Sequence, residues 1–459
     1  MVPAIRSLDG DLLKRHTAEL VERTNWSRNS LADYQQHRLK QVIQYASTAS
    51  PYYRETLGGL VARDAPLEEF PVLTKRALMA NFGDIVTDRR LTRVAIERHL
   101  DGPAPAEMLL GEYRSVATGG TTGERGVFVY NDRAWLSVMA NIVRFQRIIG
   151  VLPSTRSVGI AASSPIHMSY RFYAEQRAIR PHSPVLDLTM PVPHIVETLN
   201  AYQPEAVVTY PSFIRVLANE QMSGRLNITP RLVRSGAETL TQQVRDLALA
   251  TWNAPVINSY SCTEVGTMGH ECLHQSGLHL AEDLCAFEVV DEQNRPVPDG
   301  TCGAKLLVTT FENEILPLIR YELTDLVTLT TAPCECGLPF ARLSSIEGRR
   351  EDVLQLPKKG GGMIDVHAIR LRSPLIGTEG IRQFQLARLP DGLEITISVL
   401  PEFDSDETRV RVERTVIEAL DKLTVAPMRI LVRMVDQIER AGAGAKERLV
   451  VKAKEGPDT

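Results

Sequence analysis

A short segment rich in glycine and threonine has the composition of a phosphate-binding loop. It runs from Ala117 to Gly123, reads ATGGTTG, and is followed by the strand-like run VFVY. Glycines let backbone N–H groups turn towards an anion, and threonine hydroxyls add further donors. Such a loop can hold a polyphosphate without a large positive charge. The alternative is a surface hairpin, because glycine and threonine are also common in turns.

A second segment places a hydroxyl group and a carboxylate directly after a predicted strand. The strand reads PVINSY, and the segment Tyr260–Glu264 reads YSCTE. Ligands of open α/β sheets bind beyond the carboxyl ends of the strands, where Thr263 and Glu264 could meet a phosphate and its magnesium ion. The alternative is a turn in which one of these two side chains caps the start of a helix.

The cysteines form the third chemical feature. All six lie between Cys262 and Cys336, and the preceding 261 residues contain none. The start of the chain has no apolar core that would indicate secretion, so a disulfide framework is not expected. Metal binding and ordinary burial are the two competing explanations.

The composition predicts a globular protein of more than one packed unit. A chain of 459 residues exceeds the size of one typical hydrophobic core, and 43% hydrophobic with 24% charged residues is ordinary for a folded protein. Its 52 basic and 56 acidic residues leave a net charge of -4, which provides no basic field for nucleic acid or an anionic membrane. No stretch approaches the roughly 20 apolar residues of a membrane span. We expect a cytoplasmic location.

The middle of the chain predicts an α/β domain. Apolar spacing over residues 11–48 predicts an N-terminal helical region that ends at Pro51-Tyr52-Tyr53. From about Arg156, short apolar runs alternate with helix-like stretches, and this predicts a largely parallel, helix-covered sheet. The strands are SVGIAAS, AVVTY, RLVRSG and APVINSY, and the helices are 192–202, 212–222 and 241–252.

The last third of the chain changes character. After Gly277 the runs LCAFEVV, AKLLVTT and LVTLTT predict hairpins or a distorted barrel. Strands over 381–389 and 393–400, a helix over 406–423 and a strand MRILVRMV then predict a small α+β unit. We place the boundary in the charged stretch 348–352, which gives an N-terminal domain of residues 1–348 and a small, mobile C-terminal domain of residues 349–459.

Three weaker motifs complete a pattern. They are Ser235-Gly236-Ala237-Glu238, then Arg320-Tyr321-Glu322-Leu323-Thr324-Asp325, then Gly348-Arg349-Arg350-Glu351-Asp352. In this order, together with the two earlier segments, they resemble the acyl-adenylate-forming superfamily. The resemblance covers roughly residues 50–455 and is greatest to the branch of the phenylacetate-CoA ligases and deazaflavin-adenylating synthetases.

The resemblance implies a role for each matched position. Nucleotide contacts are implied for Thr118, Gly119, Gly120, Thr121, Thr122, Gly123, Gly236, Ala237, Glu238, Tyr260, Asp325 and Arg349. The threonines of the loop would contact the triphosphate, and Thr263 the α-phosphate. Glu264 would hold magnesium, which offsets charge as pyrophosphate leaves. Asp325 would bind the ribose hydroxyls, and Glu351 would be the hinge of the small domain. Without the neighbouring motifs, Asp325, Arg349 and Glu351 would be taken for solvated surface residues.

The same branch contains members with a structural zinc site. Here Cys272, His279, Cys334 and Cys336 would supply three thiolates and one imidazole, a closed tetrahedral set. His270 and His274 are alternative ligands, and buried free cysteines are the alternative to any metal. We expect the remaining three cysteines to be small core residues: Cys262, Cys285 and Cys302.

Three positions depart from the family pattern. Glu124-Arg125-Gly126 stands where many members have Pro-Lys after the loop, and Ser261 replaces the glycine that usually follows the tyrosine. The family also supplies a late lysine that bridges the carboxylate and the α-phosphate. In Gly442–Arg448 the usual position is occupied by Ala445, and Lys446 is one residue further on. Lys446 is our candidate, against the alternative of a solvated tail lysine.

The function implied is activation of a carboxylic acid by ATP to an acyl-AMP, with magnesium, and transfer of the acyl group to a thiol, most often coenzyme A. The alternatives are transfer to an amine or to carrier-protein pantetheine, and a nucleotide-binding protein without turnover. Serine, histidine and tyrosine side chains expected near the acid favour an aromatic or hydroxylated substrate; they are Ser164, His167, Tyr170, Tyr210, Ser212 and Ser235. A homodimer is compatible with the resemblance. No nucleic acid or membrane partner is expected.

Overall fold

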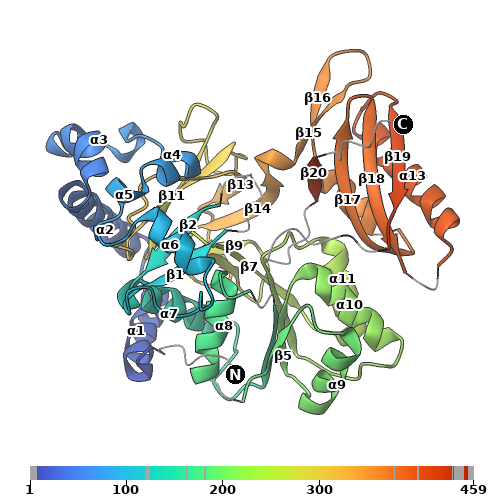
Figure 1. The fold of residues 1–459 in the computed structure, drawn as a ribbon, viewed down its shortest axis with the longest axis horizontal. Coiled ribbons are helices and arrows are strands. Elements are labelled where there is room, and N and C mark those ends of the chain that lie inside the picture. The colour runs from blue at the N-terminus through green and yellow to red at the C-terminus, as the bar shows by residue number, and fades with distance from the viewer. Residues whose placement is uncertain are drawn as a thin grey trace. The chain divides into compact units, whose positions relative to one another are not determined.

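The computed structural model describes residues 8–118, 125–161, 164–179, 182–376, 378–400, 403–436, 438 and 449–452 (Figure 1). The chain divides into two compact units. The first comprises Met1–Leu240, Val244–Leu323 and Val327–Ile346, and the second comprises Thr241–Gln243, Thr324–Leu326 and Glu347–Thr459. The described helices include none that is long and apolar enough to cross a membrane.

The first unit begins with helices. They are α1 (Gly10–Glu22), the 3-10 turn η1 (Arg23–Asn25), α2 (Arg28–Ala49), α3 (Pro51–Ala62), η2 (Leu67–Glu69), α4 (Lys75–Ala80), α5 (Phe82–Ile85) and α6 (Arg93–Leu100). The expectation that Pro51 ends the helical region is wrong, because Pro51 is the first residue of α3. Ser50 caps this helix by accepting a hydrogen bond from the Tyr53 N–H. Proline suits the first turn of a helix, where its missing N–H would have no partner.

The predicted helix-covered parallel sheet is confirmed. Its strands are β3 (Ser157–Ala161), β4 (Val185–Asp187), β5 (Ala206–Thr209), β6 (Leu232–Gly236) and β7 (Val256–Cys262). They are parallel and lie in the order β7-β6-β5-β3-β4. The helices between and before them are α7 (Asp132–Ile148), α8 (Met168–Ile179), α9 (Val192–Tyr202), α10 (Pro211–Met222) and α11 (Gln242–Trp252). Helix α8 lies on one side of the sheet and α9, α10 and α11 on the other (Figure 1).

The remaining strands that lie wholly or mostly in the first unit are antiparallel or join the sheet edge. The predicted β-rich region forms β8 (Gly266–Glu271), β9 (Leu278–Leu280), β13 (Asp325–Thr330) and β14 (Arg342–Arg349), which extend the large sheet beyond β7 in the order β13-β14-β9-β8. A second sheet has the order β10 (Cys285–Val290), β11 (Lys305–Thr310), β12 (Tyr321–Leu323). A hairpin of β1 (Arg114–Ala117) and β2 (Val127–Tyr130) is fully buried.

The second unit has the predicted α+β architecture. Its elements are η3 (Arg350–Asp352), β15 (Val353–Pro357), β16 (Met363–His367), α12 (Ile369–Ile376), β17 (Ile381–Leu389), β18 (Gly392–Val399), α13 (Ser405–Lys422), β19 (Arg429–Met434) and β20 (Val450–Lys452). The described strands form a sheet in the order β19-β18-β17-β20 and a separate β15-β16 hairpin. The inward face of α13, with Val412, Val416 and Leu420, packs on apolar residues of β17 and β18.

A buried arginine ties β12 to the N-terminal helical region. Arg320 is 1% exposed, and its guanidinium lies 3.0 Å from the carboxylate of Glu288 on β10. It also donates hydrogen bonds to the carbonyl oxygens of Glu68 (2.9 Å) and Phe70 (2.6 Å). Burial raises the pKa of Glu288, and the Arg320 charge opposes that effect. Removing either partner would therefore leave the other charge buried without compensation and would destabilise the fold.

We expect Arg320→Met to lower the free energy of unfolding by about 3–5 kcal/mol, because it leaves the Glu288 carboxylate buried without its cation. Urea unfolding at neutral pH measures this loss. In the double variant Arg320→Met/Glu288→Gln, the uncompensated charge is gone, and part of the stability should return. Equal stability of the single and double variants would contradict the pairing.

Candidate functional site

The predicted nucleotide contacts of the first unit follow strands that end at one edge of the sheet. Strands β5, β6 and β7 are parallel and in register, with Ser235 opposite Thr209 on one side and Asn258 on the other. Helix α10 begins just after β5. The segment Gly236–Glu238 starts at the last residue of β6, and Tyr260 lies near the end of β7. Carboxyl ends of adjacent parallel strands form the binding edge of open α/β sheets.

The glycine- and threonine-rich segment connects the two strands of the buried β1–β2 hairpin. Gly119, Gly120, Thr121, Thr122 and Gly123 lie outside the described residues. Thr118 closes the base of the loop: its N–H donates to the Gly126 carbonyl at 2.9 Å, and its hydroxyl accepts from the Gly126 N–H at 3.0 Å. The Lys75 ammonium also donates to the Thr118 hydroxyl, at 2.8 Å.

Thr263 and Glu264 lie in a β-hairpin turn. Strand β7 continues through Cys262 and pairs antiparallel with β8, so neither residue caps a helix, and that alternative is wrong. The hydroxyl of Tyr130 on β2 lies 2.7 Å from the Thr263 carbonyl oxygen and 2.8 Å from that of Glu264. The hairpin that carries the phosphate-loop candidate thus holds, at its opposite open end, the turn that carries the carboxylate.

The side chain of Glu264 has a partner from β12. The Tyr321 hydroxyl donates to a Glu264 carboxylate oxygen at 3.4 Å. Burial raises the pKa of Tyr321, and the Glu264 charge raises it further, so the phenol remains a donor at neutral pH. The ring of Tyr321 also meets Phe128 of β2 edge-on, with 6.4 Å between ring centres. A carboxylate oxygen is the donor type that magnesium prefers, and Glu264 is half-buried at this edge.

The segment Ser235–Glu238 has an unusual backbone and an unexpected partner. Ala237 has φ +68°, a left-handed conformation that is uncommon for a residue with a side chain. The Glu238 carboxylate accepts hydrogen bonds at 3.1 Å from both the N–H and the hydroxyl of Ser212. It therefore caps the start of α10, whose N-cap residue Tyr210 makes no side-chain cap of its own.

The other predicted nucleotide and hinge residues belong to the second unit. The Arg349 guanidinium lies 3.8 Å from the Asp325 carboxylate, so these two residues form an ion pair. Glu351 lies in the 3-10 turn η3. Lys446 is outside the part of the chain that the structure describes.

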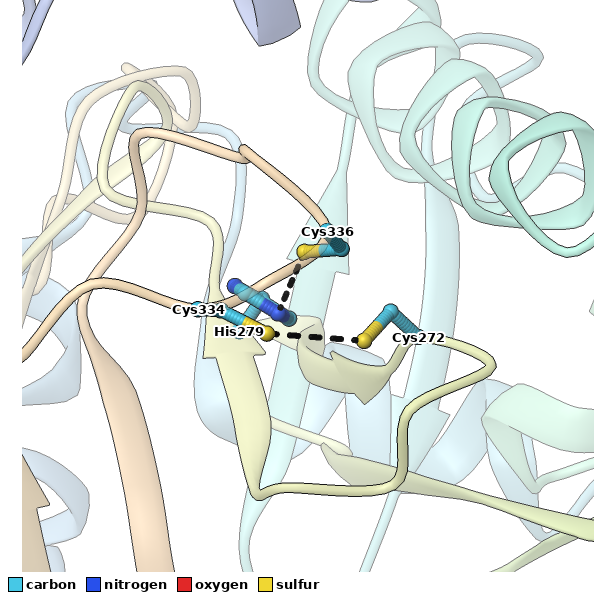
Figure 2. Close-up of side chains that lie close together, drawn as sticks. All are labelled: Cys272, His279, Cys334 and Cys336. Carbon is cyan, nitrogen blue, oxygen red and sulfur yellow. Dashed lines mark hydrogen bonds between the residues drawn. The ribbon is translucent and has the colours of Figure 1, made fainter.

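Four side chains of the cysteine window converge (Figure 2). The sulfur atoms of Cys272, Cys334 and Cys336 and a ring nitrogen of His279 all lie within 4.8 Å of one another. The Cys272 and Cys334 sulfurs are 3.8 Å apart, and the Cys336 sulfur is 3.3 Å from Nε2 of His279. Zn–S bonds of about 2.3 Å in a tetrahedron would place sulfurs about 3.8 Å apart, so the donor set fits zinc.

The protonation tendencies of the cluster suit metal binding. Burial lowers the pKa of His279 to about 4, so its ring is neutral at neutral pH and can act as a ligand. Burial raises the pKa of Cys334, but hydrogen bonds from Ser276 and the neighbouring cysteines outweigh it and bring the pKa to about 7. Burial raises the pKa of Cys272 and Cys336. A cation would offset the cost of ionising these two thiols.

The remaining histidines and cysteines lie outside this cluster. His270 stacks on Phe145 with 4.8 Å between ring centres, and His274 is 3.3 Å from the Glu335 carboxylate. Cys285 is a buried core residue, as expected, and Cys262 packs partly buried against the same core. The expectation for Cys302 is wrong, because this residue is exposed. It precedes β11 at an isolated bridge to Thr328, and its thiol donates to the Gly303 carbonyl at 3.6 Å.

Three contributors to this site were not predicted from the sequence. Tyr130 lies on a strand and Lys75 at the start of a helix, and neither belongs to a motif. Ser212 was expected near the acid, but not as a partner of Glu238. Their contacts join residues that are 133, 43 and 26 positions apart in the chain. The strand-like VFVY was the one available signal, since it placed a tyrosine on the strand that follows the loop.

Comparison with known proteins gives consistent relatives. The phenylacetate-coenzyme A ligase of Thermus thermophilus is 26% identical over 441 residues, which cover 90% of this chain and 91% of the relative. The fumarate–(S)-2,3-diaminopropanoate ligase of Enterobacter agglomerans is 23% identical over 307 residues, covering 63% of this chain and 68% of the relative. No family model matches the chain.

The fold agrees with a solved structure. A crystal structure of 2-hydroxyisobutyryl-CoA ligase in the postadenylation state, in complex with R3-HIB-AMP, matches with a TM-score of 0.74 and 19% identity over 94% of this chain and 92% of that one. The five motifs, the near-full-length relative and this fold agree. The chain is similar to the phenylacetate-CoA ligase-like branch of the acyl-adenylate-forming superfamily, as its motifs indicated.

Proposed function

We propose that this protein is an acid–thiol ligase that consumes ATP. In the first step a carboxylate oxygen attacks the α-phosphorus of ATP, the bond to the bridging oxygen breaks, and pyrophosphate leaves. In the second step a thiol sulfur attacks the acyl carbon and AMP leaves with the electron pair of the broken C–O bond. The thiol proton passes to solvent or to a base. Coenzyme A is the proposed thiol.

The observation that carries this proposal is that three segments bearing the motifs contact one another. Tyr130 links the hairpin of the phosphate-loop candidate to the Thr263–Glu264 turn, and Tyr321 links the following motif to the Glu264 carboxylate. Fixed donors and carboxylates of this kind suit a reaction in which charge shifts between phosphate oxygens, because preorganised groups need not reorganise during the reaction.

Roles for individual residues follow as part of the proposal. The loop threonines and Thr263 would donate hydrogen bonds to phosphate oxygens, and Gly236, Ala237 and Tyr260 would enclose the adenine. Glu238 would support this segment through its bonds to Ser212. Asp325 and Arg349 would lie at the ribose. Glu264 would hold a magnesium ion, which would reduce the negative charge on the departing pyrophosphate.

The acid is proposed to be aromatic or hydroxylated. Tyr210, Ser212 and Ser235 lie at the carboxyl ends of β5 and β6, and Ser164 and His167 follow β3. His167 is held against the end of β1 by a 3.2 Å contact between its Nδ1 and the Ala117 carbonyl. This mixture of rings and hydroxyl groups suits such a substrate. An amine acceptor is the alternative, since one relative is named as a ligase of fumarate and a diamino acid.

The first test is acid-dependent exchange of pyrophosphate into ATP, with magnesium present. We expect wild-type protein to catalyse it with at least one acid of an aromatic panel. Glu264→Gln should lower the rate at least about 100-fold, because it removes the anionic metal ligand, and should change the free energy of unfolding by less than about 1 kcal/mol. The same change at exposed Glu55 is the control. ATP binding without exchange on any acid would favour the non-turnover alternative.

We further propose one structural zinc ion per chain at Cys272, His279, Cys334 and Cys336. The donor spacing supports this proposal, and all four positions would be filled by protein, so the metal would stabilise the fold and would not contact substrate. Elemental analysis of the wild-type protein should give about one zinc per chain. The variant Cys272→Ser should lose most of this zinc and should have a lower melting temperature. The control variant Cys302→Ser, at an exposed cysteine, should retain the zinc content and the melting temperature of the wild type. Metal-free protein with unchanged stability would contradict this.

Lys446 is proposed as the cation that bridges the attacking carboxylate and the α-phosphate. The glycine- and alanine-rich segment around it could absorb a one-residue shift. Lys446→Ala should cost the adenylation step about 2–4 kcal/mol of transition-state stabilisation while sparing thioester formation from supplied acyl-AMP. Single-turnover rates of the two steps separate these effects. An unchanged adenylation rate would reject Lys446 and make Arg448 the next candidate.

A further inference from the structure

We propose that Lys75 is the cation of the polyphosphate site and binds the β- and γ-phosphate oxygens of ATP beside Thr118. This inference rests on the proposed function. Lys75 belongs to none of the five motifs and lies 43 residues before Thr118 in the chain. The structure nevertheless brings its ammonium to the base of the phosphate-loop candidate.

The contact between Lys75 and Thr118 is direct. The ammonium donates to the threonine hydroxyl at 2.8 Å, and the same hydroxyl accepts the Gly126 N–H at 3.0 Å. The threonine oxygen therefore receives two donors, and its own proton points elsewhere. An ammonium group carries three N–H donors, so its bond to Thr118 is compatible with a bond to a phosphate oxygen. The Lys75 ammonium and the Thr118 hydroxyl would then both donate hydrogen bonds to one phosphate group.

The glycine at position 126 leaves room for this lysine. A Cβ atom at Gly126 would lie 2.8 Å from Cε of Lys75 and 2.9 Å from the Phe128 ring. The lysine side chain therefore passes closely over the backbone at the point where the loop returns to β2. An alanine there would have to displace either the lysine stem or the aromatic ring.

The local charges favour Lys75 over other cations. The segment Ala117–Gly123 contains no lysine or arginine, and Glu124 adds a negative charge. Arg125, the nearest cation in sequence, lies 2.6 Å from the Asp101 carboxylate and is thereby engaged away from Thr118. A polyphosphate keeps negative charge even with magnesium bound, and charge-assisted hydrogen bonds to phosphate are about twice as strong as neutral ones. Lys75 supplies such a bond.

The backbone that carries Lys75 is fixed to the strand that carries Tyr321. The Leu73 N–H donates to the Arg320 carbonyl and the Glu322 N–H to the Leu73 carbonyl, each at 3.0 Å. Thr74 then caps α4 by accepting from the Ala77 N–H at 3.1 Å. Since Tyr321 contacts Glu264, one short strand positions both the proposed phosphate cation and the proposed metal ligand. The separation of the two charges is therefore set by packed backbone.

The test compares binding of three probes by titration calorimetry: MgATP, magnesium pyrophosphate and AMP. The variants are Lys75→Met, Lys75→Gln and Lys75→Arg, with Arg76→Met as a matched loss of charge at the exposed neighbouring residue and Arg125→Met as the rival cation. Lys75→Met and Lys75→Gln should weaken MgATP and pyrophosphate binding about 10- to 100-fold, the loss expected for one charge-assisted hydrogen bond. AMP affinity should change less than about 3-fold, since AMP lacks the β- and γ-phosphates.

Lys75→Arg should recover part of the lost affinity, and Arg76→Met should match wild type. Equal losses for AMP and MgATP would show that Lys75 only shapes the loop, and unchanged pyrophosphate binding in both neutral variants would overturn the proposal.

A larger loss in Arg125→Met than in Lys75→Met would assign the cation to Arg125. Wild-type protein that binds none of the three probes would overturn the proposed function and this inference together, whereas wild-type binding with no Lys75 effect overturns this inference alone.

Discussion

The turn at Thr263 and Glu264 depends on two tyrosines from strands distant in the sequence. Tyr130 holds the backbone of the turn from β2, and Tyr321 contacts the Glu264 carboxylate from β12. Because both rings are buried and meet other aromatic side chains, their hydroxyl groups have little freedom. A carboxylate held in this way needs no rearrangement when charge develops nearby, which is the condition for electrostatic catalysis. Strands β2 and β12 and the Thr263–Glu264 turn are thus parts of one packed framework.

The thiol cluster lies at the antiparallel end of the same sheet. Cys272 follows β8, His279 lies on β9, and Cys334 and Cys336 precede β14. Strand β14 pairs with β9, with Arg342 opposite His279. A metal held by these four residues would connect three strands of the sheet whose β7–β8 turn presents Glu264. Such a connection would resist local opening of the hairpin that carries the carboxylate.

The sequence predicted the fold well where hydrophobic spacing decides it. Strands β3, β5, β6 and β7, helices α9, α10 and α11, and the elements from β17 to β19 follow directly from alternating or helical apolar patterns, whereas β4 and α8 were not predicted. Pro51 was misassigned because proline both ends and begins helices, and Cys302 because composition does not reveal which strand residues face solvent. Motif order identified the superfamily. Contacts such as Lys75 with Thr118, or Glu238 with Ser212, could not be predicted, since they depend on how distant segments pack.

The central claim is that a carboxylate oxygen attacks the α-phosphorus of ATP. The most direct measurement follows an ¹⁸O label from the carboxyl group of a turned-over acid, with mass spectrometry of the nucleotide and phosphate products. Adenylation followed by thiol transfer predicts one labelled oxygen in AMP and none in pyrophosphate, because the C–O bond breaks when the thiol attacks. Label in orthophosphate, with ADP as the nucleotide product, would show an acyl-phosphate route and contradict the account.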